Sequence, residues 1–98
     1  MTIDKDIQGN VMTLKLSGRL DTTTSPELEQ VLVSSLEGIE DLRMDFTDLE
    51  YISSAGLRIL LSAQKTMNKQ GSMSISGVND TIMEIFGITG FSDILTIR

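Results

Sequence analysis

Apolar and polar residues alternate along three segments of the chain, over residues 11–17, 42–47 and 72–76. A period of two residues predicts β-strands with one buried face and one polar face. An earlier strand near residues 2–7 is joined to the first of these by a turn at residues 9–10, which is a hairpin signal. Because strands buried on both faces are continuously apolar, we expect helices to cover only one face of this sheet.

Two longer segments have apolar residues at helical spacing. The first begins at Ser25, where a serine cap, the following proline and Glu27 all favour a helix start, and it ends near Gly38. The second spans about residues 54–69 and is ended by Gly71. Each helix connects two strands, so the connected strands are expected to be parallel. The predicted buried stripe of the second helix consists of Leu57, Leu60, Leu61, Gln64 and Met67.

A third and shorter helix is predicted after the last alternating segment. Asn79 or Asp80 would cap this helix, and Gly87 would end it. Residues 94–97 would then add an edge strand. This order of elements predicts a single α/β domain over residues 1–98, with a mixed sheet of four to five strands and helices packed mainly on one face.

The composition excludes several classes of function. The chain has no Cys and no His, which removes thiolate nucleophiles, sulfur-bound metals and the commonest general base. We therefore expect no enzyme activity, no metal and no cofactor. The net charge of −6, from 14 acidic and 8 basic residues, disfavours binding to nucleic acid. Since neither a signal peptide nor a membrane-spanning run is recognisable, we expect a cytoplasmic protein that binds no membrane.

The segment at residues 45–57 carries the strongest candidate for a functional site. It runs from the end of a predicted strand through a loop into the second helix, at the strand ends where open α/β sheets usually bind ligands and partners. Ser53 and Ser54 lie at the helix start, where backbone N–H groups and the helix dipole can accommodate a phosphate. Either serine can equally be an ordinary helix cap, and Gly56 can serve only to relieve packing in the first turn.

Three motifs in the chain resemble those of STAS domains, which are found in bacterial anti-sigma factor antagonists. Tyr51-Ile52-Ser53-Ser54-Ala55-Gly56-Leu57 looks like the family signature. Leu16-Ser17-Gly18-Arg19-Leu20-Asp21 is similar to the family's strand ending in Gly-x-Leu-Asp, and Ile88-Thr89-Gly90-Phe91 resembles its late turn. The resemblance implies a single STAS-like domain in which Ser54 is the phosphorylated residue.

The chain departs from the family pattern beside the implied phosphorylation site. Ser53 stands where the family commonly has aspartate, Ala55 follows the acceptor, and Arg58 replaces a frequent glycine. With a second hydroxyl directly next to the first, Ser53 remains an alternative acceptor.

The resemblance also implies a partner-binding surface around the serine. Asp21 corresponds to a loop aspartate near the acceptor, although it is equally suited to capping the first helix. Asp48 matches an acidic residue in the loop before the serine, which is also ordinary turn chemistry. Ile59 is either an exposed contact or covered by a neighbouring helix. The implied partner-binding residues are Asp21, Thr22, Asp48, Ser53, Ala55, Gly56, Leu57, Arg58 and Ile59.

Partner switching is the function that the resemblance implies. The unmodified protein binds an anti-sigma factor that is also a serine kinase, phosphorylation of Ser54 ends that binding, and a phosphatase resets the protein. An alternative makes the chain a non-phosphorylated adaptor subunit of a transporter ATPase or of another regulatory assembly. A serine hydrolase is disfavoured because no His is present, and because Lys65 and Lys69 lie farther along the helix of Ser54.

Overall fold

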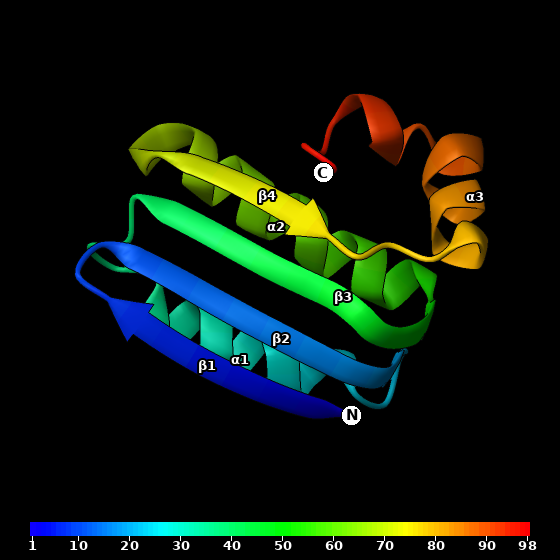
Figure 1. Cartoon of the computed structure of the whole chain (residues 1–98), viewed down its shortest axis with the longest axis horizontal. Helices are drawn as coiled ribbons and strands as arrows, with labels where there is room; N and C mark the ends of the chain where they lie inside the picture. The colour runs from blue at the N-terminus through cyan, green and yellow to red at the C-terminus, as the bar shows by residue number, and fades with distance from the viewer.

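The computed structural model describes residues 1–98 as one four-stranded sheet with three α-helices (Figure 1). The strands β1 to β4 lie in chain order across the sheet; β1 is antiparallel to β2, and the other neighbours are parallel. This arrangement confirms the predicted hairpin, the parallel crossovers and the mixed α/β class. The strands are β1 (Thr2–Gln8), β2 (Val11–Leu20), β3 (Asp41–Ile52) and β4 (Ser72–Ser76). The helices are α1 (Ser25–Ser35), α2 (Ser54–Gln70), α3 (Asp80–Thr89) and the short 3-10 helix η1 (Phe91–Asp93).

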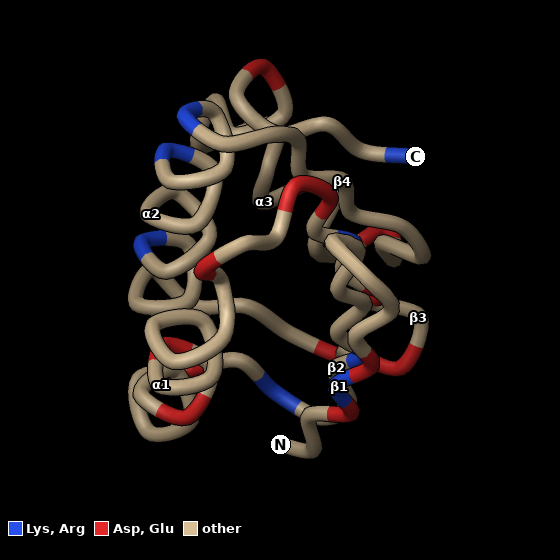
Figure 2. Tube along the Cα trace, turned by 90° about the vertical axis from the view of Figure 1, so that its left-hand side faces the viewer, with Lys and Arg blue, Asp and Glu red and all other residues tan.

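Burial follows the alternation of residues along the strands. In β2, Met12, Leu14 and Leu16 are fully buried, whereas Lys15 between them is exposed. Figure 2 shows α1 and α2 on one side of the strands. The opposite face of the sheet carries polar side chains such as Arg43 and is open to solvent. The prediction that helices cover mainly one face is therefore confirmed.

β3 is longer than the alternation of residues predicts. After Phe46 the next buried residues of this strand are Leu49 and Ile52, which are three positions apart instead of two. The pairing of β3 with β2 shifts register twice in this stretch, and each shift leaves one extra residue on β3. Such a bulge keeps the following side chain pointing inward although the period of two is broken. The predicted loop before α2 is therefore strand, and only Ser53 separates β3 from α2.

The ends of α1 differ from the sequence prediction. The N-cap is Thr24, which makes no side-chain cap bond, and Ser25 is instead the first, buried residue of the helix. α1 ends at Ser35 because the chain leaves the helix to bury both Leu36 and Ile39 in the core. Gly38 lies outside the helix with φ +83°, a conformation that glycine adopts without strain.

The C-terminal part of the chain corrects two expectations. α3 continues through Gly87 and ends at Thr89, with the left-handed Gly90 as its cap. Residues 94–97 form no fifth strand, since only a single bridge joins Ile97 to Ile75 of β4. η1 turns the chain at residues 91–93, and only the last residues of the chain reach the edge of the sheet at β4. α3 itself lies beyond the tip of β4 (Figure 1).

Replacing Asn79 by alanine is expected to lower the free energy of unfolding by about 1–2 kcal/mol. The Asn79 side chain is the N-cap of α3, accepting from Ile82 N at 2.8 Å, and its Nδ2 donates to Leu49 O at 3.0 Å. It therefore holds α3 against β3. Urea denaturation measures the loss, and Asn79→Ser should lose less, because a serine hydroxyl can still cap the helix although the bond to Leu49 is lost. Equal losses in the two variants would show that the cap does not stabilise α3.

Candidate functional site

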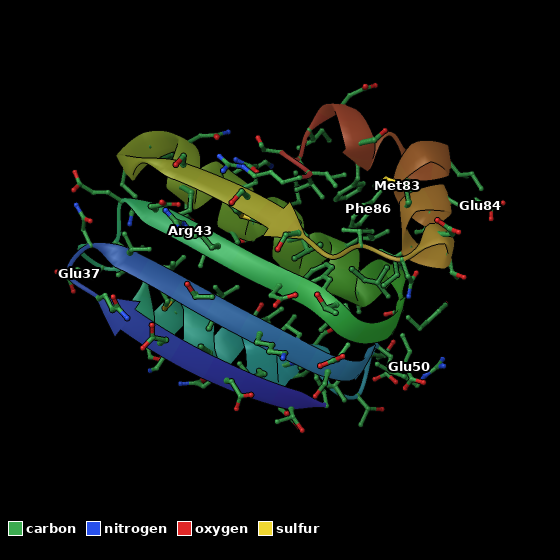
Figure 3. The ribbon with its side chains drawn as sticks, viewed as in Figure 1. Glu37, Arg43, Glu50, Met83, Glu84 and Phe86 are labelled. Carbon is green, nitrogen blue, oxygen red and sulfur yellow. The ribbon has the colours of Figure 1, made fainter.

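The C-terminal ends of the strands β2 and β3 lie beside the N-terminal ends of α1 and α2, at one end of the sheet. Ser53 N donates to Leu20 O at 2.9 Å and joins the residue before α2 to the last residue of β2. Asp21 follows directly, so both segments that carry the predicted site are neighbours. Glu50, labelled in Figure 3, lies near this end of β3. In sheets with parallel strands, binding sites usually form at the C-terminal ends of the strands.

The two candidate serines have different environments. Ser54 is the first residue of α2 and is exposed. Ser53 is the N-cap residue with an extended backbone (φ −97°, ψ 175°), but its side chain makes no cap hydrogen bond. The Ser53 Oγ atom is buried and has no hydrogen-bond partner in the protein. Ser53 therefore occupies the N-cap position, but its buried hydroxyl does not cap the helix.

Asp21 organises the turn before α1. Its Oδ1 accepts hydrogen bonds from the backbone N–H groups of Thr23 and Thr24, both at 3.0 Å, and from Thr24 Oγ1 at 3.1 Å. Its backbone carbonyl accepts from Ser25 N at 2.8 Å. These are the bonds of an Asx turn, in which an aspartate side chain accepts from backbone N–H groups two and three residues later. The backbone hydrogen bond from Thr24 is the largest cause that holds the pKa of Asp21 below its ordinary value of 3.8.

The lowered pKa of Asp21 predicts a loss of stability in acid. Because the folded-state pKa lies below 3.8, ionised Asp21 stabilises the fold above that pH, and this stabilisation disappears as the pH falls through the folded value. Asp45 adds to the same trend, since a hydrogen bond from the Thr47 side chain lowers its pKa. Thermal unfolding followed from pH 6 to pH 2.5 should show a falling Tm below about pH 4. Asp21→Asn should flatten this dependence, and an unchanged slope would contradict it.

Four of the predicted partner-binding residues line one shallow depression of about 330 Å³ between the N-terminal ends of α1 and α2. α2 contributes Ala55, Arg58 and Ile59, and Thr22 lies on the opposite side, before α1. Ile59 is half-buried, and its side chain lies between the two helices. Residues far apart in the sequence thus form one surface beside Ser54.

Gly56 and Leu57 are buried and do not reach this surface. A Cβ atom on Gly56 would lie 2.8 Å from Ile52 Cγ1 and 2.8 Å from Leu20 Cγ. The absence of a side chain therefore lets the first turn of α2 approach the ends of β2 and β3. In the free protein these two residues act on the surface by positioning α2, and a direct contact of either with a partner stays a prediction.

Asp48 is part of β3 and not of a loop, which corrects its predicted location. Its Oδ2 lies 3.5 Å from Lys15 Nζ, and both side chains are about half exposed. Lys15 belongs to the polar face of the sheet, opposite the face that carries α2. Asp48 therefore pairs across the open sheet face, because the bulges in β3 decide where its side chain points.

Arg19 and Tyr51 form a contact that sequence reasoning missed. The Arg19 guanidinium lies 4.5 Å from the centroid of the Tyr51 ring, and its Nε is 3.9 Å from Asp21 Oδ2. Arg19 of β2 and Tyr51 of β3 are paired in the register of the sheet. The sequence shows only that Arg19 and Tyr51 belong to the two motifs. It does not show that they are paired, because their register depends on the bulges in β3. A cation–π contact at this exposed site contributes about 0.5–1 kcal/mol and orders the rim beside the serines.

The other acidic residues are dispersed over the surface. Asp41, for example, pairs with Arg43 at 2.9 Å on the open face of the sheet. No three acidic side chains converge where they could hold a metal ion.

None of the helices combines the length and the apolar character that crossing a bilayer requires.

Sequence comparison relates the chain to one family. The model of the family described as STAS domain matches residues 2–98. A curated protein of Staphylococcus epidermidis, named anti-sigma-B factor antagonist, is 35% identical over 87 residues, which cover 87% of this chain and 81% of the relative. A protein of the same name from Bacillus subtilis (strain 168) is 31% identical over 100 residues, covering 99% of this chain and 92% of the relative.

Solved structures share the fold over nearly the whole chain. An anti-sigma factor antagonist from Mycobacterium paratuberculosis matches with a TM-score of 0.89 at 21% identity, covering 99% of this chain and 84% of that one. The Bacillus cell fate determinant SpoIIAA in its phosphorylated form matches with a TM-score of 0.78 at 13% identity, covering 99% and 91%. The chain therefore belongs to the STAS domain family, and the curated relatives that it matches are anti-sigma factor antagonists.

Proposed function

We propose that this chain is an anti-sigma factor antagonist that acts by partner switching through Ser54. The unmodified protein binds an anti-sigma factor that is also a serine kinase, and this binding releases the sigma factor in the cytoplasm. Phosphorylation of Ser54 ends the binding, and a phosphatase restores it. The single observation that carries the proposal is an exposed serine at the start of α2, in a chain whose relatives are anti-sigma-B factor antagonists.

Accessibility favours Ser54 over Ser53 as the acceptor. A kinase must bring the γ-phosphate of ATP into line with the attacking hydroxyl. That hydroxyl must therefore be accessible from solvent, with space around it for the active site of the kinase. Ser54 is exposed, whereas the Oγ atom of Ser53 is buried. Phosphorylation of Ser53 would first require the N-cap residue of α2 to turn outward.

The start of α2 is compatible with a phosphate. Leu57 N donates to Ser53 O in the first hydrogen bond of the helix, so the N–H groups of the first turn have no partner farther back in the helix. The first turn contains no acidic residue. Arg58 follows Ser54 by four residues and lies on the same side of the helix. A phosphate on Ser54 would therefore meet the positive end of the helix dipole and one guanidinium, and the domain would stay folded.

Catalysis is assigned to the partner and not to this chain. The kinase supplies ATP and the groups that transfer phosphate, while this chain supplies the hydroxyl. The chain has no His and no Cys, and no base adjoins Ser54 in the motif. The protein thus acts as a regulated binding partner.

Mass spectrometry tests the proposed acceptor. The protein is incubated with ATP and the anti-sigma factor kinase of the same organism, and intact mass and peptide mapping are then recorded. We expect one added phosphate on Ser54, no phosphate on Ser54→Ala and normal modification of Ser53→Ala. Modification of Ser53→Ala at a rate far below wild type, with Ser54→Ala still phosphorylated, would reassign the acceptor to Ser53. If neither the wild type nor any variant is phosphorylated, the proposed switch is contradicted.

A further inference from the structure

A groove of about 250 Å³ runs between α1 and α2 on their outer side. Its floor is apolar and is formed by Leu32 and Leu36 of the first helical segment and by Ile59 and Ala63 of α2. Val33 lines the same groove, and 77% of its surface is exposed. Apolar side chains that line a solvent-facing groove are typical of a surface that a partner covers.

The two helices beside this groove carry opposite charge. Glu29 and Glu37 line the α1 side of the groove, and α1 contains no basic residue. The polar residues with which α2 lines the groove are the uncharged Ser62, Thr66 and Gln70. The basic residues of α2, which are Arg58, Lys65 and Lys69, are exposed on the adjoining face of the helix, and α2 contains no acidic residue. Figure 2 shows basic residues along α2 and acidic residues at α1. None of these five charged side chains takes part in the ion pairs of the fold, so their charges are available to a partner.

The groove is continuous with the site at Ser54. It shares Glu29 and Ile59 with the depression between the helix starts, which Ala55 also lines. From Ala55 to Gln70, α2 rises by about 22 Å at 1.5 Å per residue. That length matches a helix of about four turns.

We propose that this groove receives one amphipathic helix of the anti-sigma factor, with its apolar face on the floor, basic residues above α1 and acidic residues above α2. This inference rests on the proposed function for the identity of the partner. A helix laid in the opposite direction would place each of its charged flanks against like charge, so the charges of α1 and α2 select one direction. Since the groove opens beside Ser54, a phosphate there would stand at one end of the bound helix.

We assign the groove to the anti-sigma factor and not to a second copy of the chain, because the groove is continuous with the depression beside Ser54. Charge does not select between these two occupants. A second copy turned about an axis along the groove would set the acidic helix of each chain against the basic helix of the other.

Two pairs of matched variants test the groove. Val33→Asp should weaken binding to the purified anti-sigma factor by about tenfold or more, because it puts a charge where the bound helix would cover an apolar side chain. Ile88→Asp is its control, since Ile88 on α3 is 79% exposed and lies away from the groove. Glu37→Lys should weaken binding by about threefold to tenfold through like-charge contact with the basic flank. Glu84→Lys on α3 changes the net charge equally and should bind as wild type; Figure 3 labels both glutamates.

The outcomes separate this inference from the proposed function. If Val33→Asp and Glu37→Lys bind as wild type while Ser54→Asp loses binding, the groove is overturned and the switch stands. If the groove variants lose binding while Ser54→Asp binds as wild type, the groove stands and the switch is overturned. If wild type fails to bind the anti-sigma factor, both are overturned. Sedimentation showing a wild-type dimer that Val33→Asp converts to a monomer would assign the groove to a second copy and overturn the helix.

Discussion

Phosphorylation of Ser54 is expected to weaken binding to the anti-sigma factor by about a hundredfold or more. The modification adds about −1.5 to −2 units of charge. Charge brought against a partner surface that has no matching group costs several kcal/mol, and each 1.4 kcal/mol is about a factor of ten in affinity. Because Ser54 is exposed at the start of α2, the charge acts on docking and not on the core. Calorimetric titration of the modified and unmodified protein measures the change.

Three variants make this prediction specific to position. Ser54→Ala should bind as the unmodified protein, and Ser54→Asp should bind at least about tenfold more weakly because it carries part of the phosphate charge. Ser92→Asp adds the same single charge at an exposed position of η1 and should leave affinity unchanged. Equal affinity of wild type, Ser54→Ala and Ser54→Asp would contradict switching at this residue.

Replacing Gly56 by alanine is expected to destabilise the protein by about 1–3 kcal/mol, although alanine is the better helix former. The added Cβ would lie 2.8 Å from side-chain atoms of both Ile52 and Leu20. Either these side chains leave their packed positions or the first turn of α2 moves away from the sheet. The second response displaces Ser54, so the rate of its phosphorylation should fall as well. Urea denaturation and a kinase assay measure the two effects.

Gly87 provides the matched control for this substitution. It is also a helical glycine, and a Cβ added there would meet no atom within 4 Å. Gly87→Ala should therefore stabilise the protein by about 0.5–1 kcal/mol through helix propensity alone. The same chemical change is thus expected to have opposite signs at the two glycines. Stabilisation by both substitutions would show that close packing does not constrain the start of α2.

The alternation of residues was sufficient to predict most of the sheet. Met12, Leu14 and Leu16 of β2 are buried as expected, because the side-chain period of a strand is fixed by backbone geometry. The end of β3 could not be predicted in this way. Its buried residues Phe46, Leu49 and Ile52 are spaced by three, and this spacing becomes a strand only when bulges form against β2.

Helix starts and ends were predicted less well than helix positions. Gly87 is a helix breaker by propensity, yet α3 passes through it because packing of Ile82 and Phe86 holds the helix to Thr89. Glycine costs a helix only about 1 kcal/mol, which tertiary packing can offset. The fifth strand failed for a related reason, since Leu95 is buried in the core while only a single bridge joins Ile97 to β4.

The sequence by itself determined the order of elements as far as the third helix, the one-sided sheet, the family and the helix start that carries Ser53 and Ser54. These follow from local periodicity, from turn and cap residues and from a contiguous motif. Only the tertiary structure decided which serine is exposed, that Gly56 is held between Ile52 and Leu20, and that a groove forms between the acidic α1 and the basic α2. The physical reason is that burial and charge pairing depend on residues distant in the chain, which no local pattern places side by side.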